Sequence, residues 1–140
     1  MEIFVDTSAF VAITNRSDQY HLRAQEFLGT LDPSIKLHTS NYIIDETITR
    51  IRMIVGHKPA LTFGKRIFSS RLYTIHYIGE VIEKEAFRIF EKYLDKKLSF
   101  TDCTSFALMK KLGIKKAFAF DEDFVALGFE IVPTLERGRC

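Results

Sequence analysis

The sequence predicts an α/β fold in which short strands alternate with amphipathic helices. Short β-prone runs recur along the whole chain, and segments with helical apolar spacing lie between them. Capping and stop residues separate the two kinds of segment. Because strands that are joined through helices pair in parallel, we expect a central, mainly parallel sheet of four or five strands with helices on both faces.

The expected strands are short apolar runs that end at polar residues. Two of these runs stop directly at an acid, Asp6 in one case and Asp121 in the other. In chain order the expected strands span residues 3–5, 35–39, 72–77, 116–120 and 129–132.

The helices in the first half of the chain are expected from apolar stripes and from their caps. Ser8 is expected to cap the first helix, and Pro33 lies just beyond the end of the second. Ser40 or Asn41 is expected to cap the third helix, which Gly56 ends. These helices span residues 9–13, 20–31 and 41–55.

The helices in the second half follow from the same signals. Pro59 suits the first turn of one helix, and residues 80–94 carry an apolar stripe opposite a charged face. Ser99 or Thr101 is expected to cap the last helix. The expected spans are 59–70, 80–94 and from that cap to Gly113.

The composition is that of one globular domain, and we expect a single domain over residues 1–140. A hydrophobic share of 46% with 13 Phe is enough for one core. The longest stretch without a charge, residues 7–15, is too short to cross a membrane. No secretory signal follows Met1, so we expect a soluble, cytoplasmic protein with no membrane contact.

Several common chemistries are excluded because their motifs are absent. The chain contains no GxGxxG, GxxxxGK[ST], HExxH, GxSxG or CxxC pattern. Cys103 and Cys140 are expected to be free thiols. The four histidines are scattered, and each is expected to be a surface or packing residue.

Charge is distributed unevenly, although 20 basic residues nearly balance 18 acidic ones. Residues 47–79 contain six basic residues and no acid, and residues 103–120 contain four lysines and no acid. Such segments are either solvated helix faces or a basic rim that binds phosphates. The second interpretation makes Arg50, Lys65, Arg66 and Lys110 candidate contacts to the phosphates of a nucleic acid.

The candidate chemistry lies in carboxylates near the expected strand ends. Asp6 and Asp121 follow strands, and binding sites in open α/β sheets form beyond such ends, although each acid alone suits a turn. Asp102 could equally belong to a capping box with Ser99. Helical periodicity does not choose between Asp45 and Glu46, and Glu46 could simply pair with the arginine at i+4, Arg50.

Four segments carry a recurring pattern of acids and hydroxyls, namely IFVDTS at 3–8, SNYIIDET at 40–47, LSFTD at 98–102 and FDEDF at 120–124. Together they resemble the PIN-domain family, and most of all its VapC-type toxin ribonucleases. The resemblance covers nearly the whole chain, in the family's order and spacing. One departure is Ala119, because the family often has Thr or Ser two residues before the last acid.

This resemblance implies a PIN-like three-layer fold and a metal-dependent endoribonuclease. It implies Asp6, Glu46, Asp102 and Asp121 as catalytic acids, and it selects Glu46 over Asp45. Mg²⁺ or Mn²⁺ would bind at Asp6, Asp102, Asp121 and Asp123, since Asp123 could share the fourth position. The implied partners are an RNA substrate, a small antitoxin in the active-site groove and a second copy of the chain.

The chemistry of such a site suits phosphodiester hydrolysis. Several carboxylates within a few Å repel each other, and a hard divalent cation relieves this repulsion. The alternatives are a housekeeping RNA-processing PIN nuclease, a receiver-like module with an acidic pocket, and a PIN scaffold that binds RNA without cutting it.

Overall fold

The structure is a computed structural model, and it describes residues 1–134. Strands and helices alternate through most of these residues, which confirms the predicted α/β class. The strands are β1 (Glu2–Val5), β2 (Lys36–Ser40), β3 (Tyr73–His76), β4 (Lys116–Phe118) and β5 (Glu130–Val132). The helices are α1 (Thr7–Thr14), α2 (His21–Thr30), α3 (Asn41–Ile54), α4 (His57–Ser69), α5 (Glu80–Lys92), α6 (Phe100–Leu112) and α7 (Asp123–Ala126).

The sheet has five strands in the order β3-β2-β1-β4-β5, and every neighbouring pair is parallel. From the central β1 the chain adds β2 and β3 on one side, and it later adds β4 and β5 on the other. The carboxyl ends of β1 and β4 therefore border the point where the order of the strands reverses. Open parallel sheets bind their ligands at such a point.

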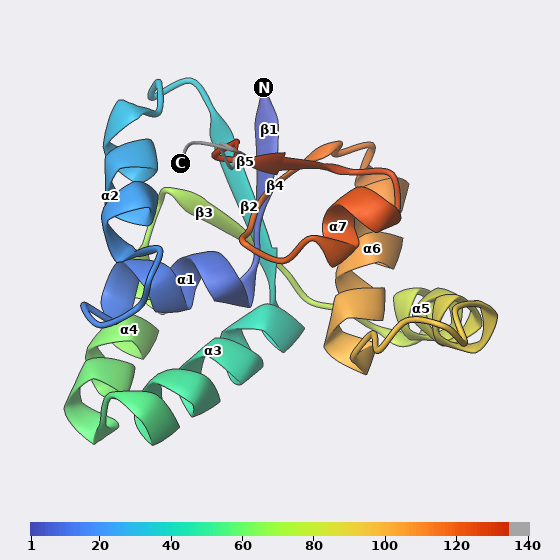
Figure 1. The fold of residues 1–140 in the computed structure, drawn as a ribbon, viewed down its shortest axis with the longest axis horizontal. Helices are drawn as coiled ribbons and strands as arrows, with labels where there is room; N and C mark the ends of the chain where they lie inside the picture. Colours follow the sequence, from blue (N-terminus) through green and yellow to red (C-terminus); the bar gives the residue numbers. More distant parts are fainter. Residues whose placement is uncertain (135–140) are drawn as a thin grey trace, which may run out of the picture.

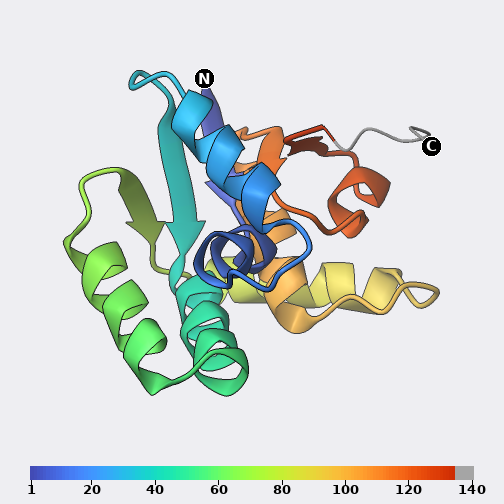
Figure 2. The same ribbon diagram turned by 60° about the vertical axis from the view of Figure 1, so that its left-hand side comes forward.

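Helices cover both faces of the sheet (Figures 1 and 2), as the sequence predicts. Helices α1, α2 and α4 lie on one side, and α5 and α6 lie on the other. Phe27 of α2 packs against Phe118 of β4 at 4.8 Å between ring centroids, and Phe106 of α6 packs against Phe124 at 5.0 Å. The rings of Phe118, Phe106 and Phe124 are fully buried and belong to the hydrophobic core.

Three local predictions were wrong or incomplete. Asp6, not Ser8, caps α1, because its carboxylate is positioned to accept the N–H of the second helical residue. Strand β4 ends at Phe118, two residues before the predicted end, although the N–H of Ala119 still bonds to Val132. The short α7 was not predicted, since a single turn carries no detectable periodicity.

Other predictions hold. Ser40 caps α3, and Ser99 caps α6 through a capping box with Asp102. Cys103 is buried and free, whereas Cys140 lies outside the described residues. None of the helices within residues 1–134 combines the length and apolar character needed to cross a membrane.

Two of the histidines pack against each other, a contact that the sequence analysis did not predict. His38 on β2 and His76 on β3 lie in contact, with 2.8 Å between Nδ1 of His38 and Nε2 of His76. Nε2 of His38 also contacts the carboxylate of Glu2 at 2.9 Å. Burial lowers the pKa of His76, and the neighbouring His38 lowers it further. These residues therefore form a polar link across three strands, which their sequence spacing does not reveal.

Candidate active site

The predicted acids come from different elements that meet at the carboxyl edge of the sheet. Asp6 directly follows β1, and Asp102 lies in the first turn of α6. Asp121 lies in the loop after β4, and Asp123 is the first residue of α7. Since β1 and β4 are neighbours in the sheet, this topology brings together acids that are more than 100 residues apart in the sequence.

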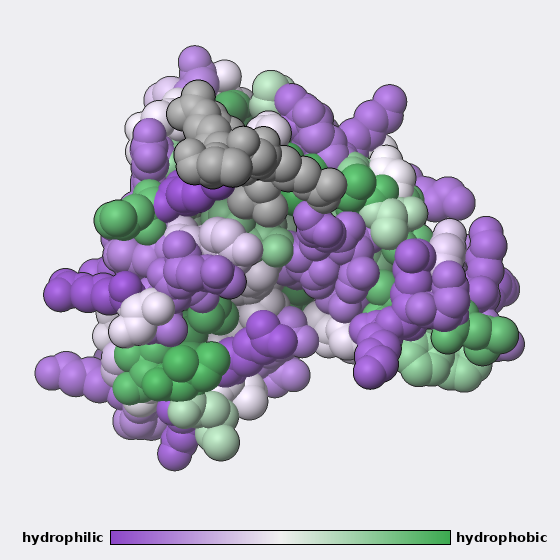
Figure 3. All heavy atoms as spheres, viewed as in Figure 1, coloured by the Kyte–Doolittle hydropathy of each residue, from purple (hydrophilic) through white to green (hydrophobic). Residues whose placement is uncertain are grey.

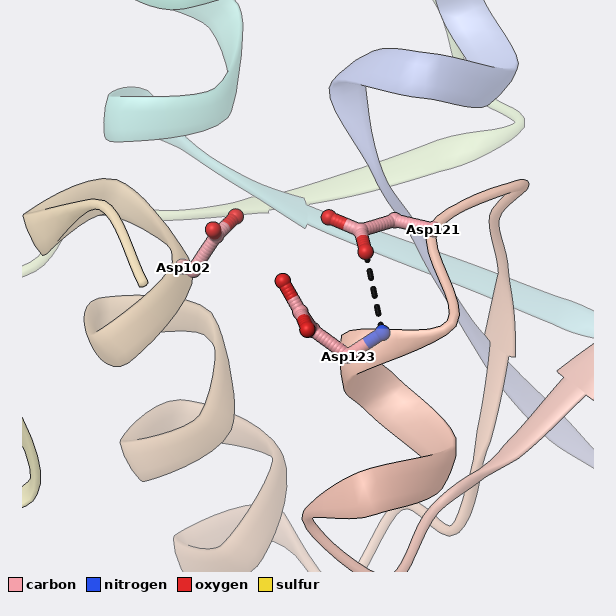
Figure 4. A group of neighbouring side chains, drawn as sticks. All are labelled: Asp102, Asp121 and Asp123. Atoms are coloured by element: carbon pink, nitrogen blue, oxygen red, sulfur yellow. Dashed lines mark hydrogen bonds between the residues drawn. The ribbon is translucent and has the colours of Figure 1, made fainter. Parts of the chain in front are cut away.

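Three of the acids form a compact cluster. Asp102, Asp121 and Asp123 each offer a carboxylate oxygen, and these oxygens all lie within 4.8 Å of one another. Figure 4 shows the carboxylates of Asp102 and Asp123 facing each other across a gap that Asp121 closes from the loop. The N–H of Asp123 donates to Oδ1 of Asp121 at 2.9 Å, so the two loop acids hold each other in place.

Asp6 lies deepest, with only 4% of its surface exposed. The pKa of Asp6 is raised to about 7, mainly by burial and also by the negative charges of Asp102 and Glu46, against hydrogen bonds from Ser8 that lower it. An acid with so high a pKa in a site of like charges is typical of a place where a cation binds.

Asp102 has two roles that the sequence alone could not combine. Its carboxylate accepts the N–H of Ser99 at 3.2 Å, and its own N–H donates to the Ser99 hydroxyl at 3.0 Å. Burial nevertheless raises the pKa of Asp102 to about 6, and the charges of Asp121 and Glu46 contribute to that rise. The capping box therefore positions an acid that also belongs to the charged cluster.

Asp123 completes the same electrostatic pattern. Partial burial raises the pKa of Asp123, and the charge of Asp121 adds to the effect. Lys96, which the sequence analysis did not single out, opposes this shift from the turn before α6. Lys96 lies in a short run of charged residues, and this pattern did not indicate that its side chain is near the acids.

The structure separates the two adjacent acids of α3. Asp45 is exposed to solvent, whereas Glu46 is partly buried and close enough to Asp6 and Asp102 to raise both of their pKa values. The sequence also allowed a surface ion pair between Glu46 and Arg50. Both residues lie within the described part of the chain, and they form no ion pair. The geometry therefore supports the acid that the resemblance selects.

This set of donors fits a hard divalent cation. Asp102, Asp121 and Asp123 supply converging carboxylate oxygens, and the buried Asp6 faces the same charges. Mg²⁺ and Mn²⁺ prefer oxygen ligands of this kind, and either ion would relieve the repulsion between the carboxylates.

The candidate RNA contacts lie at different distances from the acids. Arg50 is exposed one turn beyond Glu46 on α3. Lys65 and Arg66 are exposed on α4, where Lys65 borders a largely apolar hollow between α3 and α4. Lys110 lies in the last turn of α6, eight residues and about 12 Å of helix rise away from Asp102. The structure does not bring Lys110 to the acids, and its role stays a prediction.

A scan of the chain against known families matches the PIN domain over residues 3–130. With this match and the fold described above, the chain belongs to the PIN-domain family. It is 35% identical over 127 residues to the 23S rRNA-specific endonuclease VapC20 of Mycobacterium tuberculosis, which covers 91% of this chain and 95% of the relative.

Solved structures agree with this assignment. The crystal structure of M. tuberculosis VapC20, described as a sarcin-ricin loop cleaving toxin, superposes with a TM-score of 0.86 over the same shares of the two chains. FitAcB of Neisseria gonorrhoeae shares the fold at 17% identity, with a TM-score of 0.67 over 94% of this chain and 96% of the other. Within its family, the chain is an endoribonuclease of the VapC toxin type.

Proposed function

We propose that this chain is a Mg²⁺- or Mn²⁺-dependent toxin that cleaves 23S ribosomal RNA in the cytoplasm, at the sarcin-ricin loop. The main support is the 35% identity to VapC20 over 91% of the chain, at a TM-score of 0.86. The acids that the resemblance implies lie near one another at the carboxyl edge of the sheet, which supports hydrolysis of a phosphodiester.

The acids divide into two roles in this proposal. Asp6, Asp102, Asp121 and Asp123 hold the cation, and the raised pKa values of Asp6, Asp102 and Asp123 reflect the burial and negative charge that the cation would offset. When bound, the cation supplies an acidified water and neutralises charge on the phosphate. Glu46 accepts a hydrogen bond from the attacking water and so orients it. The products are a 5′-phosphate and a 3′-hydroxyl.

The test is cleavage of intact ribosomes and of a synthetic sarcin-ricin hairpin by the purified protein. We expect one cut in the hairpin with Mg²⁺ or Mn²⁺ and none in EDTA, while a hairpin with the same stem and a scrambled loop stays intact. Equal cleavage of both hairpins would contradict the proposed target. A housekeeping nuclease would instead cut a precursor RNA and leave mature ribosomes intact.

The basic face of α4 is expected to bind phosphates of the RNA. Replacing Lys65 and Arg66 together by Gln should weaken RNA binding and reduce the slope of log K against log salt by about 2. Metal affinity should not change, because both side chains are exposed on α4, which lies on the other side of the sheet from α6. Filter binding at several salt concentrations measures the slope, and an unchanged slope would show that this face is only solvated.

The partners in this proposal are a small antitoxin, which would cover the acids, and a second copy of the chain. Exposed aromatic residues support protein contacts: Phe68 of α4 is 60% exposed, and Phe87 and Phe90 of α5 are 53% and 46% exposed. In the view of Figure 3, one hydrophobic patch lies at the lower left, over the region of α3 and α4, and another lies at the lower right, over α5.

We expect light scattering to report a dimer at micromolar concentration. The variants Phe68→Ser and Phe87→Ser form a matched pair, since each removes one exposed ring from a different helix. The variant that becomes monomeric identifies the interface. A wild type that stays strictly monomeric at high micromolar concentration would exclude the dimer.

A further inference from the structure

The pairing between β1 and β4 changes where the two strands reach the acids. The N–H of Asp6 donates to the carbonyl of Phe118 at 3.0 Å, which extends the parallel ladder by one step. In a regular ladder the carbonyl of Asp6 would next accept the N–H of Phe120. Instead it accepts the N–H of Ala9 at 3.1 Å, because α1 begins there. The N–H of Phe120 therefore needs a different acceptor.

Ser8 supplies that acceptor. Its hydroxyl oxygen accepts the N–H of Phe120 at 3.0 Å. The same hydroxyl donates its proton to Oδ2 of Asp6 at 2.7 Å, and the N–H of Ser8 reaches the same oxygen at 3.2 Å. One hydroxyl thus joins the first acid to the backbone of the loop after β4.

This bridge acts on both sides of the acid cluster. Both contacts from Ser8 go to Oδ2 of Asp6, so they fix the carboxylate through that oxygen and leave Oδ1 without a hydrogen bond from Ser8. Phe120 directly precedes Asp121, and its ring stacks on Tyr20 at 4.5 Å with 2° between the ring planes. Position and orientation of the loop acids therefore depend on the same hydroxyl that orients Asp6.

We propose that Ser8 is a positioning residue that sets the distance between Asp6 and the loop that carries Asp121 and Asp123. The proposal rests on the metal-dependent function proposed above, because the acids need fixed spacing only if they share a ligand. Supporting groups of this kind typically change metal affinity 10- to 100-fold.

The test compares Ser8→Ala and Ser8→Thr with the matched control Ser105→Ala. The Ser105 hydroxyl is buried in α6 near the site, and it has no hydrogen-bond partner within residues 1–134. In calorimetric titration with MnCl₂ and no RNA, Ser8→Ala should bind Mn²⁺ about 10- to 100-fold more weakly than wild type. Ser8→Thr keeps the hydroxyl and should bind like wild type, as should Ser105→Ala.

A second measurement needs no metal. In the metal-free protein the Phe120 amide should exchange with solvent at least about tenfold faster in Ser8→Ala than in wild type or Ser8→Thr. Unchanged protection of this amide would overturn the proposal, and so would equal weakening of Mn²⁺ binding in Ser8→Ala and Ser105→Ala. If wild type binds no Mn²⁺, the proposed function fails, and the exchange of this amide alone then upholds or overturns the bridge.

Discussion

Asp102→Asn should abolish RNA cleavage and yet leave the metal-free protein at least as stable as wild type at pH 8. Loss of a group that orients a metal ligand typically costs 10- to 100-fold, so loss of a ligand should lower the cleavage rate by at least about a hundredfold. Stability should rise because burial and the neighbouring Asp121 and Glu46 disfavour an ionised Asp102. The amide oxygen of Asn can still accept the N–H of Ser99, so the cap is largely kept.

Added metal should reverse the order of stabilities. At a free Mn²⁺ concentration of 100 Kd, wild type gains about 2.7 kcal/mol, which raises its melting temperature by several degrees. Asp102→Asn should gain much less. The matched control is Asp45→Asn, which makes the same chemical change at an exposed acid of α3 outside the cluster.

Asp45→Asn should cleave RNA and respond to metal like wild type. A mutant at Asp102 that is destabilised in EDTA, gains as much from Mn²⁺ as wild type and cleaves normally would reduce Asp102 to a helix cap.

The architecture could be predicted because it depends on local signals repeated along the chain. Apolar runs such as residues 3–5 and caps such as Ser40 are encoded within a few neighbouring positions. The errors fall where tertiary contacts decide. Asp6 caps α1, and the Ser8 hydroxyl instead accepts the N–H of Phe120 in the loop after β4, a contact between residues 112 positions apart.

The site was less accessible from spacing alone. Glu46 and Asp45 flank the apolar stripe of α3 at similar angles, and only the resemblance chose between them before the fold placed Glu46 beside Asp6. Runs of charge were no better a guide. The lysines at 110–116 carry the same charge as the basic residues of α4, but they lie in the last turn of α6, in the loop after it and at the first residue of β4. This places them at the amino edge of the sheet. Sequence reports how many charges there are, and the topology decides which edge they occupy.

Asp6→Asn should change the pH dependence of stability in the metal-free protein more than any other single substitution. The ordinary pKa of an aspartate is 3.8, and burial with the charges of Asp102 and Glu46 raises that of Asp6 to about 7. Between these values the folded state holds a proton that the unfolded chain releases, so wild type loses stability as the pH rises from about 4 to about 7. This loss is on the order of 4 kcal/mol by pH 8.

The Asn side chain does not titrate and remains a good helix cap, so Asp6→Asn should escape this loss. In EDTA, urea denaturation should find the variant close to wild type at pH 4 and distinctly more stable at pH 8. Asp32→Asn is a control of opposite sign, because hydrogen bonds from Ser34 lower the pKa of this exposed acid, and its replacement should slightly reduce stability at neutral pH. If the stability difference between Asp6→Asn and wild type were the same at pH 4 and pH 8, Asp6 would carry no buried charge, and the electrostatic case for a cation beside it would fail.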